Sequence, residues 1–164
     1  MIDSSSPVRP KPIVALAISL VAVVIASGVG GLASTSSSDD YQRLEQPGWA
    51  PPSWVFGPAW TLLYALMAVA AWLVWRTGPS PETRRALTFY GIQLVLNAAW
   101  TPLFFGLGWR GVAFAELSML VVMLVATVVL FWRRRPVAGV LLVPYLGWST
   151  FALCLNFAVW QLNN

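Results

Sequence analysis

Five long stretches of the sequence are apolar and almost free of charge, and this pattern limits the folds open to the chain. Each stretch holds about 20 or more residues, the length of helix that crosses roughly 30 Å of hydrocarbon. The chain is 58% hydrophobic and only 10% charged, too few charges to cover the surface of a soluble domain. Four stretches have no charged residue and one has only Glu116; they are residues 13–32, 46–75, 86–109, 111–132 and 136–164.

We therefore predict an all-α fold, an integral membrane bundle of five transmembrane helices. Residues 13–162 form a single membrane domain, and residues 1–12 form a disordered N-terminal tail. A signal peptide is the alternative for the first stretch, although about 20 apolar residues exceed the usual 7–15. The predicted helices lie near residues 13–33, 54–75, 86–107, 111–132 and 137–160.

The basic residues predict how the bundle is oriented. With five spans, eight of the ten Lys and Arg residues lie on one side, and only Arg43 and Arg110 lie on the other. The positive-inside rule then places the N-terminus inside and the C-terminus outside, in a multi-pass membrane protein. The basic residues form short loop clusters without a folded platform, so nucleic acid is not an expected partner.

The chain has no histidine and one cysteine, which narrows its chemistry. Zinc sites, haem with a histidine axial ligand, histidine acid–base catalysis and an internal disulfide are all excluded. We expect no metal site and no covalent cofactor.

The long first loop, residues 34–53, ends in a run rich in proline and tryptophan that continues into the second predicted helix. Pro47, Pro51 and Pro52 forbid a regular helix there. Trp49, Trp54 and Trp60 therefore sit where a stiff, non-helical loop enters a membrane helix, which suggests a lid over an aromatic pocket.

Polar and aromatic residues recur on one face of three predicted helices, toward their outer ends. Amide side chains within a bilayer point into the protein, so these faces converge. A mostly apolar site with a few polar groups is typical of small-molecule binding. Asn97 and Asn156 could instead serve only as hydrogen-bond bridges between helices. The residues expected to line or cover the cavity are Trp49, Trp54, Trp60, Tyr64, Asn97, Trp100, Tyr145, Trp148 and Asn156.

Several motifs resemble the tryptophan-rich sensory protein/translocator protein family, which includes the peripheral benzodiazepine receptor. The resemblance spans residues 13–162. The motifs are Trp49-Ala-Pro-Pro-Ser-Trp-Val-Phe, Ala59-Trp-Thr-Leu-Leu-Tyr64, Asn97-Ala-Ala-Trp-Thr-Pro-Leu-Phe-Phe-Gly106, Pro144-Tyr-Leu-Gly-Trp-Ser-Thr-Phe-Ala152 and Leu155-Asn-Phe157.

The resemblance implies a five-helix bundle, often a homodimer, with a cavity under the first loop that binds porphyrins such as protoporphyrin IX or haem. The family's pocket tryptophans match Trp60 and Trp148, and its third-helix amide matches Asn97. The family's cholesterol pattern requires a tyrosine and a basic residue where this chain has Phe157 and Gln161, so a sterol site is not favoured.

Three functions remain open at this point. The leading hypothesis is a membrane tetrapyrrole-binding sensor or regulator in porphyrin metabolism or stress response. The first alternative is an enzyme that degrades porphyrin in light, with Trp60 and Trp148 as candidate catalytic residues. The second is a transporter of porphyrins or other hydrophobic small molecules.

Overall fold

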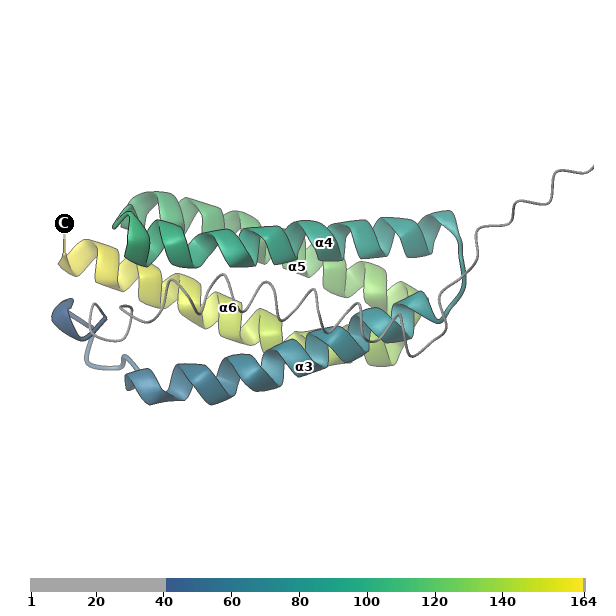
Figure 1. Ribbon diagram of the computed structural model, residues 1–164, viewed down its shortest axis with the longest axis horizontal. Helices are drawn as coiled ribbons and strands as arrows, with labels where there is room; N and C mark the ends of the chain where they lie inside the picture. The colour runs from purple at the N-terminus through teal and green to yellow at the C-terminus, as the bar shows by residue number, and fades with distance from the viewer. Residues whose placement is uncertain (1–40, 164) are drawn as a thin grey trace, which may run out of the picture.

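The computed structural model describes residues 41–163, and this part of the chain is almost entirely helical (Figure 1). The tail, the predicted first helix and residues 34–40 of the first loop lie outside the described residues. Helix α6 packs against both α3 and α5, and α5 packs against α4. The elements are η1 (Ser53–Val55), α3 (Phe56–Trp75), α4 (Pro81–Thr101), η2 (Pro102–Gly106), α5 (Arg110–Arg134) and α6 (Pro136–Leu162).

Three of the four long helices are long and apolar enough to cross a membrane: α3 with η1, α5 and α6. Helix α4 falls outside this set because its first turns carry Glu82, Arg84 and Arg85, and its buried face carries amides. The all-α membrane-bundle class predicted from the sequence is confirmed, with four of the five predicted helices in the described residues.

Helix α4 begins five residues earlier than the predicted third helix. Its start is set by capping residues that precede the apolar stretch, and the prediction used only the apolar stretch. The Ser80 hydroxyl accepts a hydrogen bond from the Thr83 backbone N–H at 3.1 Å, and Pro81 occupies the first helical position. Both are strong helix-start signals. Charged residues can occupy this turn because it lies at the end of the bundle.

A short π-helix, η2, follows α4 and ends the third predicted span. Pro102 lacks a backbone N–H and cannot continue the α-helical pattern. The Leu107 N–H instead bonds to the Pro102 carbonyl at 2.9 Å, five residues back. Gly108 then turns the chain toward α5 with a φ of 65°, a conformation that favours glycine.

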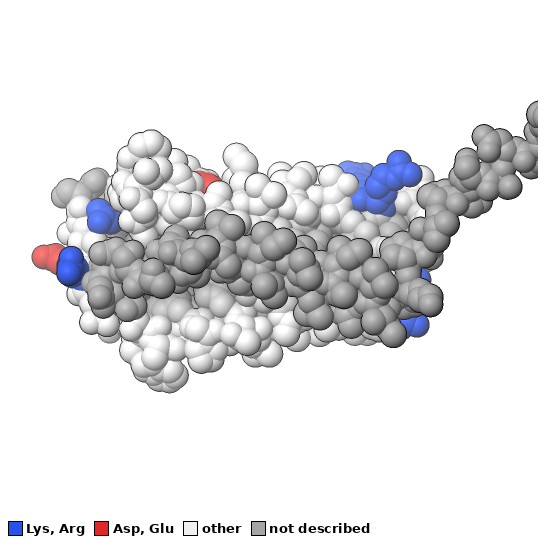
Figure 2. Space-filling view, in the orientation of Figure 1, with Lys and Arg blue, Asp and Glu red and all other residues white. Residues whose placement is uncertain are grey.

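The two ends of the bundle differ in charge. We call the end with the α3–α4 and α5–α6 connections the arginine end, and the end with residues 41–55, the η2–α5 connection and the last turn of α6 the loop end. Figure 2 shows basic side chains concentrated at one end of the molecule, on the right. The arginine end holds Arg76, Arg84, Arg85, Arg133, Arg134 and Arg135; the loop end holds Arg43 and Arg110.

Small and apolar side chains pack the helices tightly toward the arginine end. Ala70, Val74 and Phe131 are fully or almost fully buried there. Gly139 lies so close to α5 that an added Cβ would be 2.9 Å from the Trp132 Cα atom. This packing fixes the helices at the arginine end, and the buried amides Gln93, Asn97 and Asn156 lie farther toward the other end.

Candidate functional site

Four aromatic rings from α3 and α6 meet in the loop half of the bundle. Trp60 stacks on Tyr64, with ring centroids 5.2 Å apart and planes 29° apart. The same indole meets Tyr145 edge-on at 6.1 Å and Trp148 edge-on at 6.5 Å. One helical turn separates Trp60 from Tyr64, and roughly one turn separates Tyr145 from Trp148, so each helix presents its pair on one face. The rings form a continuous aromatic surface between the two helices.

A chain of hydrogen bonds runs from this cluster into α4. The Tyr64 hydroxyl donates to Asn97 Oδ1 at 2.8 Å, and Asn97 Nδ2 donates to the Tyr145 hydroxyl at 3.0 Å. The Tyr145 hydroxyl in turn donates to Gln93 Oε1 at 3.0 Å. Asn97, Tyr145 and Gln93 are buried, so the chain joins three helices away from solvent.

The chain ends on donors that have no acceptor. The Gln93 side-chain nitrogen is buried and lacks a hydrogen-bond partner within the described residues, and so does the nearby buried hydroxyl of Tyr90, one turn away on α4. Leaving a buried donor unpaired costs about 1–3 kcal/mol. The site therefore has spare hydrogen-bonding capacity for water or for a polar group of a ligand.

The first loop is joined to the aromatic cluster by further ring contacts. Phe56, at the start of α3, meets Trp148 at 5.7 Å and Tyr41 of the loop at 5.5 Å, both edge-on. Trp49 meets Phe151 of α6 edge-on at 5.8 Å, and Phe151 touches Trp148 at 5.7 Å. Two routes of contacting rings thus connect the loop with the centre of the site.

The loop has its own fixed structure, as its prolines predict. The Ala50 N–H bonds to the Pro47 carbonyl at 2.9 Å, and the Gln46 amide donates to the Tyr41 carbonyl. The Tyr41 hydroxyl points to the Pro51 carbonyl at 3.5 Å. Burial of Tyr41 raises the pKa of its phenol above the usual 10.0.

An asparagine at the end of α6 holds the start of this loop. Asn163 Oδ1 accepts from the Glu45 N–H at 2.9 Å, and Asn163 Nδ2 donates to the Glu45 carbonyl at 2.9 Å. The two bonds copy the pairing between neighbouring strands, so the loop is attached to the helix that carries Trp148. No sequence spacing could indicate a contact between residues so far apart in the chain.

Trp100 and Asn156 form a second polar unit closer to the loop end. Trp100 Nε1 donates to Asn156 Oδ1 at 3.0 Å, and Asn156 Nδ2 donates to the Arg110 carbonyl at 3.0 Å. Asn156 is buried and links α4, α5 and α6. These bonds are those of a bridge between helices, the alternative considered from the sequence.

The nine predicted ligand residues therefore fall into distinct groups. Trp60, Tyr64, Asn97, Tyr145 and Trp148 form one cluster, and Trp100 and Asn156 form the unit beside it. Trp49 lies on Phe151 above the cluster, whereas Trp54 is 73% exposed. Their contact with a ligand stays a prediction. The structure adds Gln93, Phe56, Phe151 and Tyr41 to the surroundings of the site.

The residues fit a porphyrin in their chemistry. Indole and phenol faces suit a flat conjugated ring, and the unpaired Gln93 donor suits a carboxylate. The rings touch one another, so a flat ligand can enter only if Trp60 and Trp148 move apart. Within residues 41–163, no group of three or more His, Cys, Asp or Glu side chains could hold a metal ion.

Comparison with known proteins identifies the protein family of the chain. Residues 17–161 match the TspO/MBR family. The chain belongs to this family. It is 39% identical to the tryptophan-rich protein TspO of Archaeoglobus fulgidus, over 87% of this chain and 94% of that protein. It is 43% identical to the tryptophan-rich sensory protein of Cereibacter sphaeroides, over 75% and 76% of the two chains.

The human translocator protein is similar as well, at 40% identity over 76% of this chain and 75% of its own. Members therefore occur in archaea, bacteria and mammals. The TspO/MBR match confirms the family resemblance drawn from the motifs around Trp49, Trp60, Asn97 and Trp148. This protein is thus a membrane member of a family of sensory and translocator proteins.

Proposed function

We propose that the protein binds a tetrapyrrole of the protoporphyrin IX type within the membrane and acts as a sensor or regulator in porphyrin metabolism or stress response. One observation carries this proposal: Trp60, Tyr64, Asn97, Tyr145 and Trp148 converge beneath the first loop. The relatives include a sensory protein and a translocator protein by name, which is consistent with a ligand-responsive role.

The contacts suggest how the ligand binds. Trp60 and Trp148 cover the two sides of the macrocycle, and the Gln93 amide donates to a propionate carboxylate. Aromatic contacts of this kind add about 0.5–1.5 kcal/mol each beyond the burial of surface. Residues 45–52 close over the ligand, held by Asn163 and by the ring contacts of Trp49 and Tyr41.

The proposal includes a location and an assembly. Because the arginine end carries six of the eight described basic residues, we place it in the cytoplasm of a bacterium, with the first loop and the C-terminus outside. We also propose a homodimer. Labelling a Ser53→Cys variant in intact cells tests the orientation, since a cytoplasmic loop would react only after the membrane is permeabilised.

The binding site is tested by tryptophan fluorescence. Protoporphyrin IX should quench the wild-type protein, and the Trp60→Phe/Trp148→Phe double variant should lose much of this quenching while still binding. The matched control is Trp109→Phe/Trp132→Phe, which changes two exposed indoles far from the cluster. Equal quenching in wild type and the first double variant would place the porphyrin elsewhere.

The proposed position of Trp60 and Trp148 on the two sides of the ligand also favours a second candidate function, light-dependent breakdown of the bound porphyrin. Both indoles would touch the excited macrocycle, with dioxygen from solution as the oxidant. Illumination of a stoichiometric complex in air should then yield a new absorption spectrum, and the Phe double variant should yield much less. An unchanged spectrum in air would contradict this second function, and only the binding function would remain.

Transport is less well supported by the described helices. A path across the membrane would need polar or open space toward the arginine end, where Ala70, Val74, Ala86 and Phe131 are buried against one another. Flux of porphyrin into sealed liposomes containing the protein tests this function directly.

A further inference from the structure

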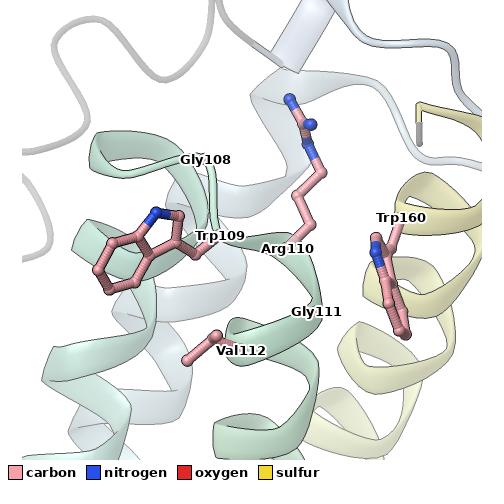
Figure 3. Close-up of a pocket in the computed structure, with 6 residues that line it drawn as sticks. All are labelled: Gly108, Trp109, Arg110, Gly111, Val112 and Trp160. Atoms are coloured by element: carbon pink, nitrogen blue, oxygen red, sulfur yellow. The ribbon is translucent and has the colours of Figure 1, made fainter.

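A hollow lies at the loop end of the bundle, apart from the aromatic cluster. It opens between the first turn of α5 and the last turns of α6 and has a volume of about 520 Å³ (Figure 3). None of the nine predicted porphyrin residues lines it. The lining residues are Gly108, Trp109, Arg110, Gly111, Val112 and Trp160.

Gly111 allows the floor of this hollow to form. A Cβ atom at this position would lie 2.9 Å from the Trp160 Cζ2 atom. Because glycine has no Cβ, the indole of Trp160 lies flat against the start of α5. Figure 3 shows Arg110 and Trp160 on opposite sides of the opening, with Trp109 projecting away beyond Arg110.

Arg110 brings a positive charge to the hollow and has an unused donor. Its Nε atom is buried and lacks a hydrogen-bond partner within the described residues. Its backbone carbonyl is fixed by Asn156 Nδ2 at 3.0 Å, so the base of the side chain is held in place. Arg110 as a whole is half-buried, but its Nε–H is shut off from solvent without an acceptor, and an anionic ligand would supply one.

The backbone adds further donors beside Arg110. Gly111 and Val112 lie in the first turn of α5, where backbone N–H groups have no acceptor within the helix. The residue before the helix, Trp109, provides no side-chain cap. The positive end of the helix dipole and the guanidinium thus act on the same small volume, which favours a phosphate.

The surroundings indicate that the anion carries an apolar tail. Val112 and Phe157 are exposed on the bundle surface next to the hollow, and the rings of Phe114, Phe157 and Trp160 contact one another. Tryptophans such as Trp109 and Trp160 are typical of the level of the lipid headgroups. A molecule held here would place its charge at the headgroup level and its apolar part against α5 and α6.

We propose that this hollow is a binding site for the phosphate of a phospholipid in the leaflet at the loop end. The phosphate oxygens accept from the Arg110 guanidinium and from the N–H groups of Gly111 and Val112. The acyl chains lie along Val112 and Phe157. The site is separate from that of the tetrapyrrole proposal: none of the nine residues predicted for that ligand lines it, and only Asn156, through its bond to the Arg110 carbonyl, touches both.

The test uses the purified, delipidated full chain in detergent and a dioleoyl phosphatidylglycerol with brominated acyl chains, which quenches nearby tryptophans. Arg110→Gln should weaken binding by about tenfold or more, the effect of losing a charge-assisted contact. Arg43→Gln is the matched control because it removes the other basic residue of the loop end. Trp160→Phe should remove part of the quenching without a comparable loss of affinity.

Three results would overturn the proposal. The first is equal affinity of Arg110→Gln and Arg43→Gln for the lipid. The second is equally tight binding of a brominated diacylglycerol, which has no phosphate and would reveal only an apolar groove. The third is full competition by millimolar inorganic phosphate, which would assign the site to free phosphate. If Arg110→Gln does not fold, Arg110→Lys serves instead, because lysine keeps the charge without the planar fork and should still weaken binding.

Discussion

The two ends of this bundle are built from different kinds of residue. At the arginine end, small and apolar side chains fill the space between helices, and Gly139 allows α5 and α6 to touch. Toward the loop end, aromatic rings and amides are buried, and the Gln93 nitrogen and the Arg110 Nε atom have no partner in the described residues; the arginine end has one such guanidinium atom, Arg134 Nε. The comparison teaches that the arginine end is held mainly by close packing, whereas the part toward the loop end buries more polar groups, among them the unpaired Gln93 amide nitrogen, that a ligand can use.

The largest effect should come from emptying the core of the arginine end. Phe131 is fully buried and stacks on Tyr90 at 5.7 Å. Phe131→Ala should lower the free energy of unfolding by about 3–5 kcal/mol because it leaves a cavity. Unfolding in mixed micelles, followed by circular dichroism, measures this loss, and Val129→Ala on the exposed face of α5 is the control. A similar loss in both variants would contradict the role assigned to this end.

Asn97→Leu tests whether Asn97 serves mainly to bridge helices or to bind the ligand. Both groups of the Asn97 amide bond to tyrosines within the protein, so its loss should lower the free energy of unfolding by about 1–3 kcal/mol. A double-mutant cycle with Tyr145→Phe isolates the pairwise part. We expect stability to fall more than porphyrin affinity. If affinity falls while stability is unchanged, Asn97 is a ligand residue rather than a bridge between helices.

The loop should affect binding far more than folding. Pro51→Gly/Pro52→Gly increases the entropy lost when the loop is ordered, by about 0.4–1 kcal/mol for each residue. Porphyrin affinity should fall roughly 4- to 30-fold, with the helical content unchanged. Pro136→Gly at the arginine end is the control. Unchanged affinity in the double variant would mean that the loop does not cover the site.

A smaller effect should appear at high pH. Burial raises the pKa of Tyr41, so the loop favours the neutral phenol. The stability from this contact is complete below pH 10, the usual pKa of tyrosine, and is lost as the pH rises through the higher pKa of the closed loop. Trp49 fluorescence should therefore shift above pH 10 in wild type. Tyr41→Phe, which cannot ionise, should lose the shift; its persistence would point to another group.

The sequence predicted the fold class and the positions of four helices because length and lack of charge are local properties. It placed the start of α4 five residues late, since the cap formed by Ser80 and Pro81 lies outside the apolar stretch. Hydrophobicity likewise could not predict the π-helix after Pro102 or the exact end of the third predicted helix.

The site was predicted in part. Helical spacing and family resemblance together identified Trp60, Tyr64, Asn97, Tyr145 and Trp148, which the structure brings into contact. Trp54 is 73% exposed, because it lies in the short 3-10 helix η1, whose period differs from that of the α-helix assumed for this position. The attachment of Glu45 by Asn163 depends on how the chain ends meet in space, which no local pattern encodes.

The hydrogen bonds from Tyr64 through Asn97 and Tyr145 to Gln93 all point in the same direction along their sequence of donors. Bond dipoles aligned in this way polarise one another, so each bond is strengthened by the next. An acceptor that engages the free Gln93 nitrogen would increase the polarity of that amide and, through it, of the two tyrosine hydroxyls. An acceptor bound at Gln93 on α4 would then change the electron density of the Tyr64 ring on α3, without any shift of the helices.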